Sequence, residues 1–487
     1  MIDIRPVLLI VGIFIAAFSA VMLIPMAVDL YDGHSNWQAF GTAALVGGAT
    51  GVGMAAAAWG RISSFSVRQG FLITTASWLA LVLTASLPLW LGTMDMSYTD
   101  AFFEAMSGLT TTGATVVVGL DEAPRGFLLW RSILQWIGGV GVVIMAIALL
   151  PFLSVGGMQL FRLESSDPSE KIMPGASQIA TAITSLYVSF TAICFSIYWG
   201  MGMGAFDALN HAMTTIATGG YSTKDASFGH FIESGAVTGP IDLVATLFMI
   251  IGALPFAVYL LALRGNALAP FKDGQVQFFF AAATIFIAVI AGRIVALLDV
   301  DALTAFRLAA FNVISIMTGT GYATTDYNQW GPFAVGFFFC IMFVGGCAGS
   351  TSCGLKIFRL QVAFAALTLY SKRLAHPHRA SVARYNGRPI SNDVFLSVLS
   401  FFFLYFATFG TVGVLLSFFQ LDTVTALSAA GSAIANVGPG LGEIIGPAGN
   451  YAPLPMGAKW ILSAAMLLGR LELFTVLVLF APGFWQR

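Results

Sequence analysis

The chain has 487 residues, of which 58% are hydrophobic and only 9% are charged, and its formal net charge is −1. Soluble domains carry about 25% charged residues, so this composition indicates an integral membrane protein and argues against a soluble protein with a large core. The balanced charge points to no partner, and we expect no nucleic-acid binding. The four cysteines lack CxxC or Cys/His spacing, so we expect free thiols and no metal site built from them.

Two hydrophobic stretches come first in the chain, at about 6–29 and 37–60. Each is close to the ~20 apolar residues that a helix needs to cross a bilayer. The first has no small-residue cleavage site, so it is predicted to be a retained span rather than a signal peptide. Together they form a predicted two-span segment over residues 1–62.

Four units follow, predicted at 63–165, 166–270, 271–375 and 376–487, each with the order span, short helix, Thr/Gly-rich segment, span. The spans are predicted at about 69–93, 127–153, 177–201, 239–263, 276–298, 332–369, 393–420 and 458–481. The short helices are predicted at about 99–109, 205–216, 302–316 and 423–435. The chain is therefore predicted to be an all-α membrane protein with ten transmembrane helices, in which four pseudo-symmetric units surround a central pore.

Four glycines mark equivalent positions in these units, and they lie 107, 101 and 117 residues apart. They are Gly113, Gly220, Gly321 and Gly438. An alanine precedes each glycine by twelve residues. One such segment alone is more typical of a loop or a helix-packing patch, but four at matched offsets indicate a repeated functional element.

The Thr/Gly-rich segments are predicted to form a selectivity filter. Backbone carbonyls that converge from four segments replace the hydration shell of a cation, and glycine adopts the positive φ angles that turn successive carbonyls the same way. The C-terminal ends of the short helices carry partial negative charge and would point at the ion path. The predicted filter residues are Thr111, Thr112, Gly113, Thr218, Gly219, Gly220, Gly319, Thr320, Gly321, Asn436, Val437 and Gly438.

Polar residues stand nine positions before three of the four glycines, namely Glu104, His211 and Asn312. Their equal offsets suggest hydrogen bonds that support the filter from behind. The fourth unit has Ala429 at this position, so the symmetry fails there. A proton relay through Glu104 or His211 is an alternative role.

The second span of the third unit is interrupted by a segment rich in small residues over 345–354. Each glycine inside a helix costs about 1 kcal/mol relative to alanine, so this span is not expected to be one uniform helix. We predict a mobile gate, and a kink that packs against neighbouring helices is the alternative. The predicted gate residues are Gly345, Gly346, Cys347, Gly349, Ser350, Gly354 and Lys356, the last as an anchor or a contact for a regulator.

Arg470 falls near the middle of the predicted last span. An arginine at that depth costs about 2.5–3.5 kcal/mol on insertion scales, so it is expected to face a cavity or a partner. A structural ion pair with an acidic residue of another helix is the alternative to facing a cavity. Glu472 is two positions away and on a different helical face, which makes it a poor partner.

Lys and Arg gather in the loops that join one unit to the next, and such residues mark the cytoplasmic side. They are Arg61, Arg68, Arg162, Lys171, Arg264, Lys272, Lys372, Arg373, Arg379, Arg384 and Arg388. Both termini are therefore predicted to be cytoplasmic, with the Thr/Gly-rich segments facing outward. Acidic residues near those segments, such as Asp121 and Asp225, would raise the local cation concentration, or they are simply polar loop residues.

These segments resemble those of the Trk/Ktr/HKT superfamily of potassium transporters, and specifically bacterial TrkH-type subunits. The resemblance covers essentially the whole chain and is carried by segments 108–115, 214–223, 318–324 and 435–440. It implies a potassium-selective path, K⁺ as the transported ion, a homodimer in the bacterial inner membrane, and a cytosolic TrkA-type regulatory subunit that binds NAD or ATP. It also implies that the 345–354 segment is a gate below the filter and that Arg470 lies beneath the filter, where its positive charge would be a barrier to cations in the pore.

The leading interpretation is gated, channel-like potassium uptake. Potassium symport coupled to H⁺ or Na⁺ and a less selective monovalent cation (K⁺/Na⁺) channel are alternatives. An intramembrane enzyme is disfavoured because the spans contain no nucleophile with its base and no paired acids. A non-conducting receptor would not need four glycines at one level.

Overall fold

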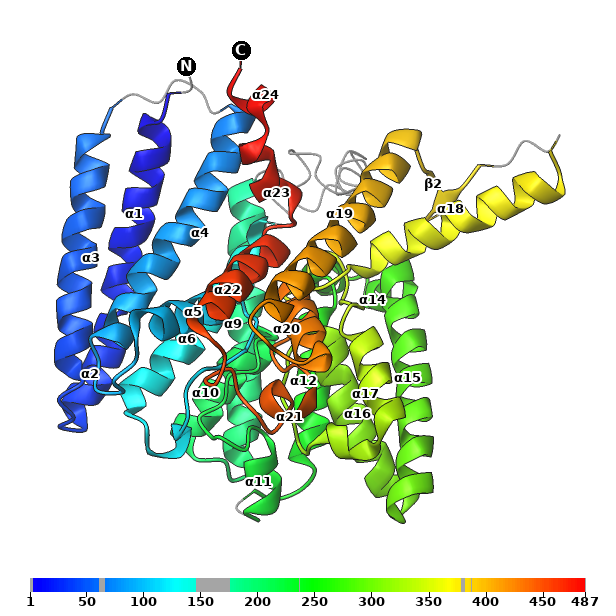
Figure 1. The fold of residues 1–487 in the computed structure, drawn as a ribbon, viewed down its shortest axis with the longest axis horizontal. Coiled ribbons are helices and arrows are strands. Elements are labelled where there is room, and N and C mark those ends of the chain that lie inside the picture. Colours follow the sequence, from blue (N-terminus) through cyan, green and yellow to red (C-terminus); the bar gives the residue numbers. More distant parts are fainter. Residues whose placement is uncertain are drawn as a thin grey trace.

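The computed structural model describes residues 3–60, 66–145, 176–235, 237–377, 382–386 and 388–486. Within them the regular secondary structure is helical except for one antiparallel pair of short strands, β1 (Arg384–Tyr385) and β2 (Arg388–Pro389). Both ends of the chain lie at the same end of the molecule (Figure 1). A chain that crosses a membrane an even number of times has both of its ends on one side.

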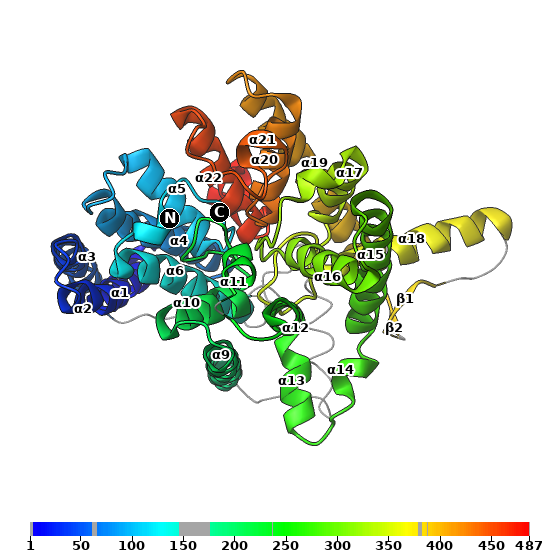
Figure 2. The ribbon, with the colours of Figure 1, turned by 90° about the horizontal axis from the view of Figure 1, so that it is seen from below.

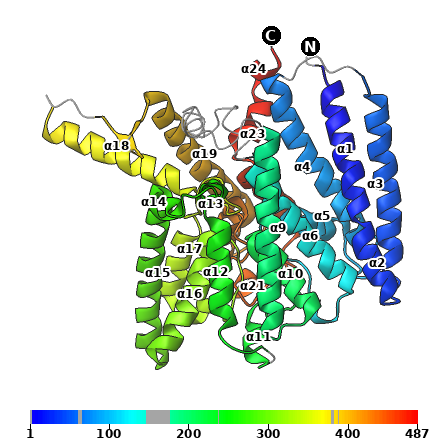
Figure 3. The ribbon, with the colours of Figure 1, turned by 180° about the vertical axis from the view of Figure 1, so that it is seen from behind.

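The N-terminal segment forms a helical hairpin at one edge of the molecule (Figures 1 and 3). Helix α1 (Arg5–Val21) continues into α2 (Leu23–Tyr31), and α3 (Trp37–Ala57) returns alongside them. Gly12 and Gly51 allow the two backbones to approach, because a β-carbon at either position would lie 2.7 Å from the carbonyl oxygen of the other. Small residues serve this close packing in membrane helices.

Each of the four predicted units contains a long helix, a short helix and a second long segment, in that order. The first unit holds α4 (Val67–Trp90), α5 (Tyr98–Leu109) and α6 (Arg125–Ile144). The second holds α9 (Ala176–Gly200), α10 (Ala205–Ile216), α12 (Ile241–Ala253) and α13 (Phe256–Leu263). The third holds α15 (Gly274–Leu298), α16 (Ala302–Thr318), α17 (Pro332–Ile341) and α18 (Ile357–Ala375). The fourth holds α19 (Asn392–Ser417), α20 (Thr423–Ala435), α22 (Met456–Arg470) and α23 (Phe474–Leu477).

Short helical turns complete the described chain. They are η1 (Leu120–Glu122), α11 (Gly229–Glu233), α14 (Ala269–Lys272), η3 (Tyr327–Trp330), α21 (Gly442–Ile445), η4 (Val478–Phe480) and α24 (Pro482–Trp485). Of the basic residues that predict the orientation, Arg61, Arg162, Lys171 and Arg379 lie outside the described residues, as does the predicted span beyond Met145. The side chain of Arg388 also lies outside the described part of the structure.

The count of spans differs from the expected ten. Among the described residues, seven helices are long and apolar enough to cross a membrane, or nine if two bent pairs each count as one span. The ten-span prediction therefore stays a prediction. The third unit accounts for the difference between nine and ten, because α17 ends at Ile341 and α18 begins only at Ile357. In Figure 1, α18 then projects sideways from the body of the molecule.

Two spans predicted as continuous helices are broken. The span predicted at 239–263 bends by 92° between α12 and α13, because Pro255 lacks an N–H group and disfavours helical geometry at Leu254 before it. The span predicted at 458–481 bends by 105° between α22 and α23. Glu472 and Leu473 turn this corner with positive φ angles of 62° and 39°, which the apolar sequence gives no reason to expect.

The short helices α5, α10, α16 and α20 surround one centre when the molecule is viewed from below (Figure 2). Three of them begin at a side-chain cap, from Ser97, Asp301 and Asp422. Hydrogen bonds from Thr425 hold the pKa of the Asp422 carboxyl below its usual range. The C-terminal halves of all four helices are buried, so their ends are fixed against the centre.

Candidate functional site

The four short helices end in the same motif. The main-chain N–H of Thr112, Gly219, Thr320 and Val437 donates to the carbonyl five residues earlier, on Ser107, Thr214, Ser315 and Ser432, at 2.8, 2.9, 2.8 and 3.0 Å. The residue before each donor is left-handed, as in a Schellman cap. These residues are Thr111, Thr218, Gly319 and Asn436, with φ between 48° and 74°.

A second left-handed residue stands two positions further on in every unit. Gly113, Gly220, Gly321 and Gly438 have φ angles of 85°, 79°, 83° and 105°. Thr111 and Thr218 are β-branched, so their left-handed conformation is a strained one that the surrounding structure must enforce. The same alternation in four segments of different sequence indicates one shared backbone geometry.

The four segments form a closed ring. A β-carbon on Gly113 would collide with the carbonyl oxygen of Gly219, and one on Gly220 would collide with that of Thr320. In the same way, Gly321 abuts the carbonyl oxygen of Val437, and Gly438 abuts that of Thr112. Each glycine therefore packs on the next segment at the residue just before that segment's own glycine, and the fourth segment returns to the first.

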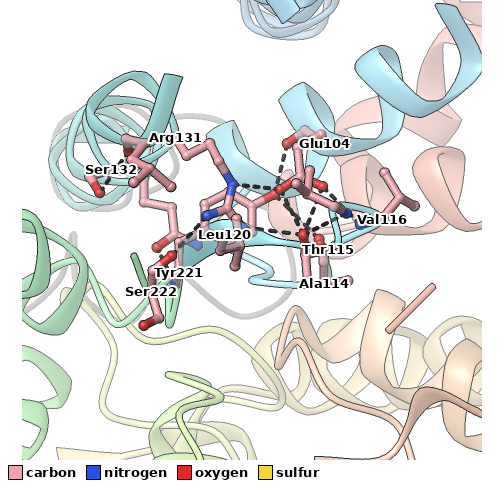
Figure 4. A network of polar contacts seen from close by, with 12 residues as sticks. Glu104, Ala114, Thr115, Val116, Leu120, Arg131, Ser132, Tyr221 and Ser222 are labelled. Atoms are coloured by element: carbon pink, nitrogen blue, oxygen red, sulfur yellow. Dashed lines mark hydrogen bonds and ion pairs between the residues drawn. The ribbon is translucent and has the colours of Figure 1, made fainter. Parts of the chain in front are cut away.

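A buried ion pair supports the first segment (Figure 4). Arg131 on α6 lies 2.8 Å from Glu104 on α5, and their side chains are 1% and 0% exposed. Glu104 also accepts the main-chain N–H of Val116 at 2.9 Å, and Arg131 donates to the carbonyl of Ser222 in the second unit at 2.9 Å. The pair thus joins the first segment to the second.

The predicted support from His211 and Asn312 is present. His211 contacts the hydroxyl of Ser222 at 3.0 Å, and Asn312 donates to the hydroxyl of Thr324 at 2.8 Å. In the fourth unit the support comes from Ser428, whose hydroxyl accepts the N–H of Leu441 at 2.9 Å. Ser428 stands one position before Ala429, so it does not share the offset from the glycine that the supporting residues of the other units have.

Two further residues hold the second segment and were not predicted. Gln135 on α6 donates to the carbonyl of Gly219 at 2.5 Å and accepts the N–H of Tyr221 at 2.9 Å. The phenol of Tyr221 reaches the carbonyl of Glu104 at 2.8 Å. The segment is therefore fixed from the first unit, through contacts that depend on tertiary structure rather than on a local pattern.

Asn436 joins the first and fourth segments. Its side-chain amide donates to the hydroxyl of Thr112 at 2.8 Å and to the carbonyl of Met466 on α22 at 2.9 Å. Glycines on the second long helices allow those helices to press against the ends of the short ones. A β-carbon on Gly138 would collide with the carbonyl of Leu109, and one on Gly469 would collide with that of Ile434.

The loop between α17 and α18 packs against the ends of the short helices. It holds all seven predicted gate residues. Thr218 donates to the hydroxyl of Thr351 at 3.2 Å, and Ser352 donates to the carbonyl of Thr318 at 2.6 Å. Residues 347–353 are all buried, and Ser350 and Thr351 are completely buried. Gly349 and Gly354 adopt φ angles of 74° and 75°, and a β-carbon on Gly345 would collide with the carbonyl of Cys353.

The loop also completes the broken second span of the second unit. The N–H groups of Cys347 and Thr351 donate to the carbonyls of Ala253 and Gly252, at 3.0 and 3.1 Å. Irregular backbone at membrane depth is tolerated only where protein satisfies it or where it lines a watery cavity. The break at Pro255 and the loop of the third unit therefore satisfy each other.

Lys356 and Arg470 both turn toward this loop. The Lys356 ammonium group donates to the carbonyl of Ser352, and the side chain is buried, so it anchors the loop from within. Arg470, the last residue of α22, donates to the carbonyls of Thr351 and Gly138 at 3.3 and 2.8 Å and contacts the thiol of Cys353. Within the described residues no carboxylate pairs with Arg470.

Glu472 pairs instead with Arg359 at the start of α18. The two charged groups lie 2.5 Å apart, and the guanidinium stacks 3.7 Å from the ring centroid of Phe401 on α19. Glu472 is one of the two residues that turn the corner between α22 and α23 with positive φ. The pair thus connects α18, the far side of the loop, to the break in the last span.

A cavity opens on the side of the ring away from this loop. It is lined by all four glycines, Gly113, Gly220, Gly321 and Gly438, and by the segments that follow them. Asp225 in its wall accepts the N–H groups of Gly119 and Leu120, both at 3.0 Å. The ammonium group of Lys224 lies 3.3 Å from the carboxylate of Asp121. These two acids connect the loops of the first and second units.

Four buried short helices that end in one closed ring of segments, set among helices long and apolar enough to cross a bilayer, define an integral membrane protein. A family model described as "TrkH: Cation transport protein" matches residues 52–487. The chain belongs to the TrkH family, a family of transport proteins rather than enzymes, and the resemblance noted from the sequence is confirmed.

Three relatives show the extent of the similarity. The chain is 43% identical to the Trk system potassium uptake protein TrkI of Halomonas elongata, over 99% of this chain and 97% of that protein. It is 35% identical to the Trk system potassium uptake protein TrkH of Escherichia coli, over 99% of each. The crystal structure of the potassium transporter TrkH from Vibrio parahaemolyticus superposes with a TM-score of 0.91 at 34% identity, over 100% of both chains.

Proposed function

We propose that this protein takes up potassium across the bacterial inner membrane through a gated, channel-like pore. The observation that carries the proposal is the closed ring in which each glycine packs on the carbonyl of the next segment. Such a ring offers main-chain oxygens from four sides to a dehydrated cation. The names of the relatives specify potassium as the ion.

The loop over 345–354 is the proposed gate. It contacts the ends of α5, α10 and α16 through Thr111, Thr218 and Thr318. Its buried position beneath the ring supports a closed pore, and its glycines allow the backbone to rearrange. Arg470 is the proposed barrier, because its guanidinium lies beside the same loop with no carboxylate partner among the described residues.

A cytosolic TrkA-type subunit that binds NAD or ATP is the proposed regulator. The only strands in the described residues are two residues long each, so that part of the chain has no strand, glycine-rich loop and helix for binding a nucleotide. The orientation with cytoplasmic termini follows from the distribution of Lys and Arg. The regulator would then reach the gate from the end of the molecule that holds both termini.

A homodimer is the proposed assembly. Helix α18 projects from the body of the protein (Figure 1) and exposes Phe364, Leu367, Tyr370 and Leu374. A second copy would cover these side chains. Light scattering of the detergent-purified protein tests this, with Leu367→Glu as the variant. A monomeric wild type would contradict the homodimer, whereas a variant that still forms the dimer would contradict the role of the exposed face of α18.

Flux into liposomes tests the function itself. Purified protein should carry potassium down its gradient, and the reversal potential should follow potassium alone. A reversal potential that moves with pH or with sodium would instead identify a coupled symporter, and equal permeability to sodium would identify a less selective channel. Absence of any cation flux, with and without the cytosolic partner, would overturn the proposal.

A further inference from the structure

The charges that line the cavity outside the ring are unequal among the four units. Among its described lining residues only Arg131, Lys224 and Asp225 are charged. Arg131 is neutralised by Glu104, and both side chains are almost completely buried. Lys224 is 21% exposed, so it is the cation in this wall that meets solvent.

Lys224 is held in a fixed place close to the second segment. It stands four residues after Gly220, and its N–H donates to the hydroxyl of Ser222 at 3.0 Å. Its ammonium group lies 3.3 Å from Asp121, which is 43% exposed. Four residues after the other glycines stand Val117, Thr325 and Gly442, so one unit in four carries a positive charge here.

Lys224 reduces the net negative charge of the group that it forms with Asp121 and Asp225. Lys224, Asp121 and Asp225 carry a net charge of −1 together, and without the lysine the same group carries −2. Fixed negative charge at the mouth of a cleft raises the local concentration of cations. The lysine therefore opposes the attraction that the two carboxylates would otherwise exert on an arriving cation.

We propose that Lys224 sets how readily cations enter the outer cavity, and thereby the external potassium concentration at which transport is half-maximal. The inference rests on the proposed function. A unit charge at about 10 Å in water changes the local concentration of a monovalent ion about twofold. The Lys224→Gln variant should therefore reach half-maximal transport at about half the concentration of the wild type, with its maximal rate unchanged.

Ionic strength separates this effect from a structural one. The Debye length is about 30 Å at 0.01 M and about 3 Å at 1 M, so the difference should be present at low ionic strength and vanish when choline chloride is added to about 1 M. Rubidium tracer uptake into liposomes that contain the full chain gives both parameters. The Asp121→Asn variant, which removes one negative charge, should shift half-saturation the opposite way.

Arg125 provides the matched control. It also pairs with an aspartate, Asp32, at 3.0 Å and is 49% exposed, but it does not line the cavity. Arg125→Gln should leave half-saturation unchanged, and Lys224→Arg should behave as the wild type. The inference is overturned if Lys224→Gln and Arg125→Gln act alike, or if the shift persists at high salt. A wild type without flux refutes the proposed function, whereas flux with an unchanged half-saturation refutes only the role of Lys224.

Discussion

Arg470 and Thr351 meet beneath the ring of glycines, where the guanidinium donates a hydrogen bond of 3.3 Å to the main-chain carbonyl. The two residues belong to different units, one at the end of α22 and one in the loop between α17 and α18. Arg470 is only 3% exposed. A full positive charge is therefore held against the loop proposed to be the gate.

Removing this charge should increase transport. We expect Arg470→Gln to raise potassium flux several-fold in liposomes, because a positive charge beside the path is an electrostatic barrier to cations. Glutamine keeps an amide that can donate to a carbonyl. Arg470→Lys keeps the charge and should stay near the wild-type flux. Equal increases in both variants would show that the hydrogen bonds, and not the charge, restrain the ion.

Adding a side chain at the ring should abolish selective transport. In Gly321→Ser the new β-carbon would collide with the carbonyl oxygen of Val437, and the φ angle of 83° disfavours a side chain at this position. We expect flux or selectivity for potassium over sodium to be lost while the protein stays folded. Gly292→Ser on α15, where a β-carbon meets open space, is the control. A selective Gly321→Ser variant would contradict the assignment.

Breaking the buried pair of Glu104 and Arg131 should destabilise the protein. Removal of one partner leaves an uncompensated buried charge, at a cost of about 3–5 kcal/mol in the free energy of unfolding. Thermal unfolding in detergent should show this for Glu104→Gln and for Arg131→Met, and the double variant should recover part of the loss. The half-exposed pair of Arg125 and Asp32 should contribute at most about 1 kcal/mol. If both single variants are as stable as the wild type, the pair of Glu104 and Arg131 does not stabilise the protein.

Separating Arg359 from Glu472 should weaken closure of the loop. The pair fixes the start of α18 against a corner that positive φ angles strain. We expect Glu472→Gln to raise the flux of the reconstituted protein in the absence of its cytosolic partner. Arg373→Gln, an exposed change further along α18, should not do so. If both variants conduct as the wild type does, the pair stabilises the fold without influencing the gate.

The sequence could predict the short helices and the glycines because both are local and repeated four times. Left-handed residues at the ends of α5, α10, α16 and α20 need glycine, or a strained threonine or asparagine, and this leaves a visible pattern. The interruption near Gly345 was equally visible as a local excess of glycine. These features require only neighbouring residues to be read together.

Other parts of the site depend on contacts between distant segments. Arg131 and Gln135 lie on an ordinary apolar helix, and only the fold brings them to Glu104 and Gly219. In the fourth unit, where Ala429 breaks the symmetry, the support comes from Ser428 at the adjacent position. The corner at Glu472 follows no local signal, since Arg359, more than a hundred residues earlier, is its partner. The spacing of residues in the sequence does not show which distant residues will contact each other in the fold.

The contact of Gly438 with the carbonyl of Thr112 carries a consequence for biosynthesis. A nascent chain that has inserted only three units presents oxygens from three sides and leaves the fourth open. If the ring binds the ion as proposed, such a chain lacks the fourth set of oxygens that would complete the site. Selective conduction through the ring is therefore expected only after the fourth unit has been synthesised and inserted.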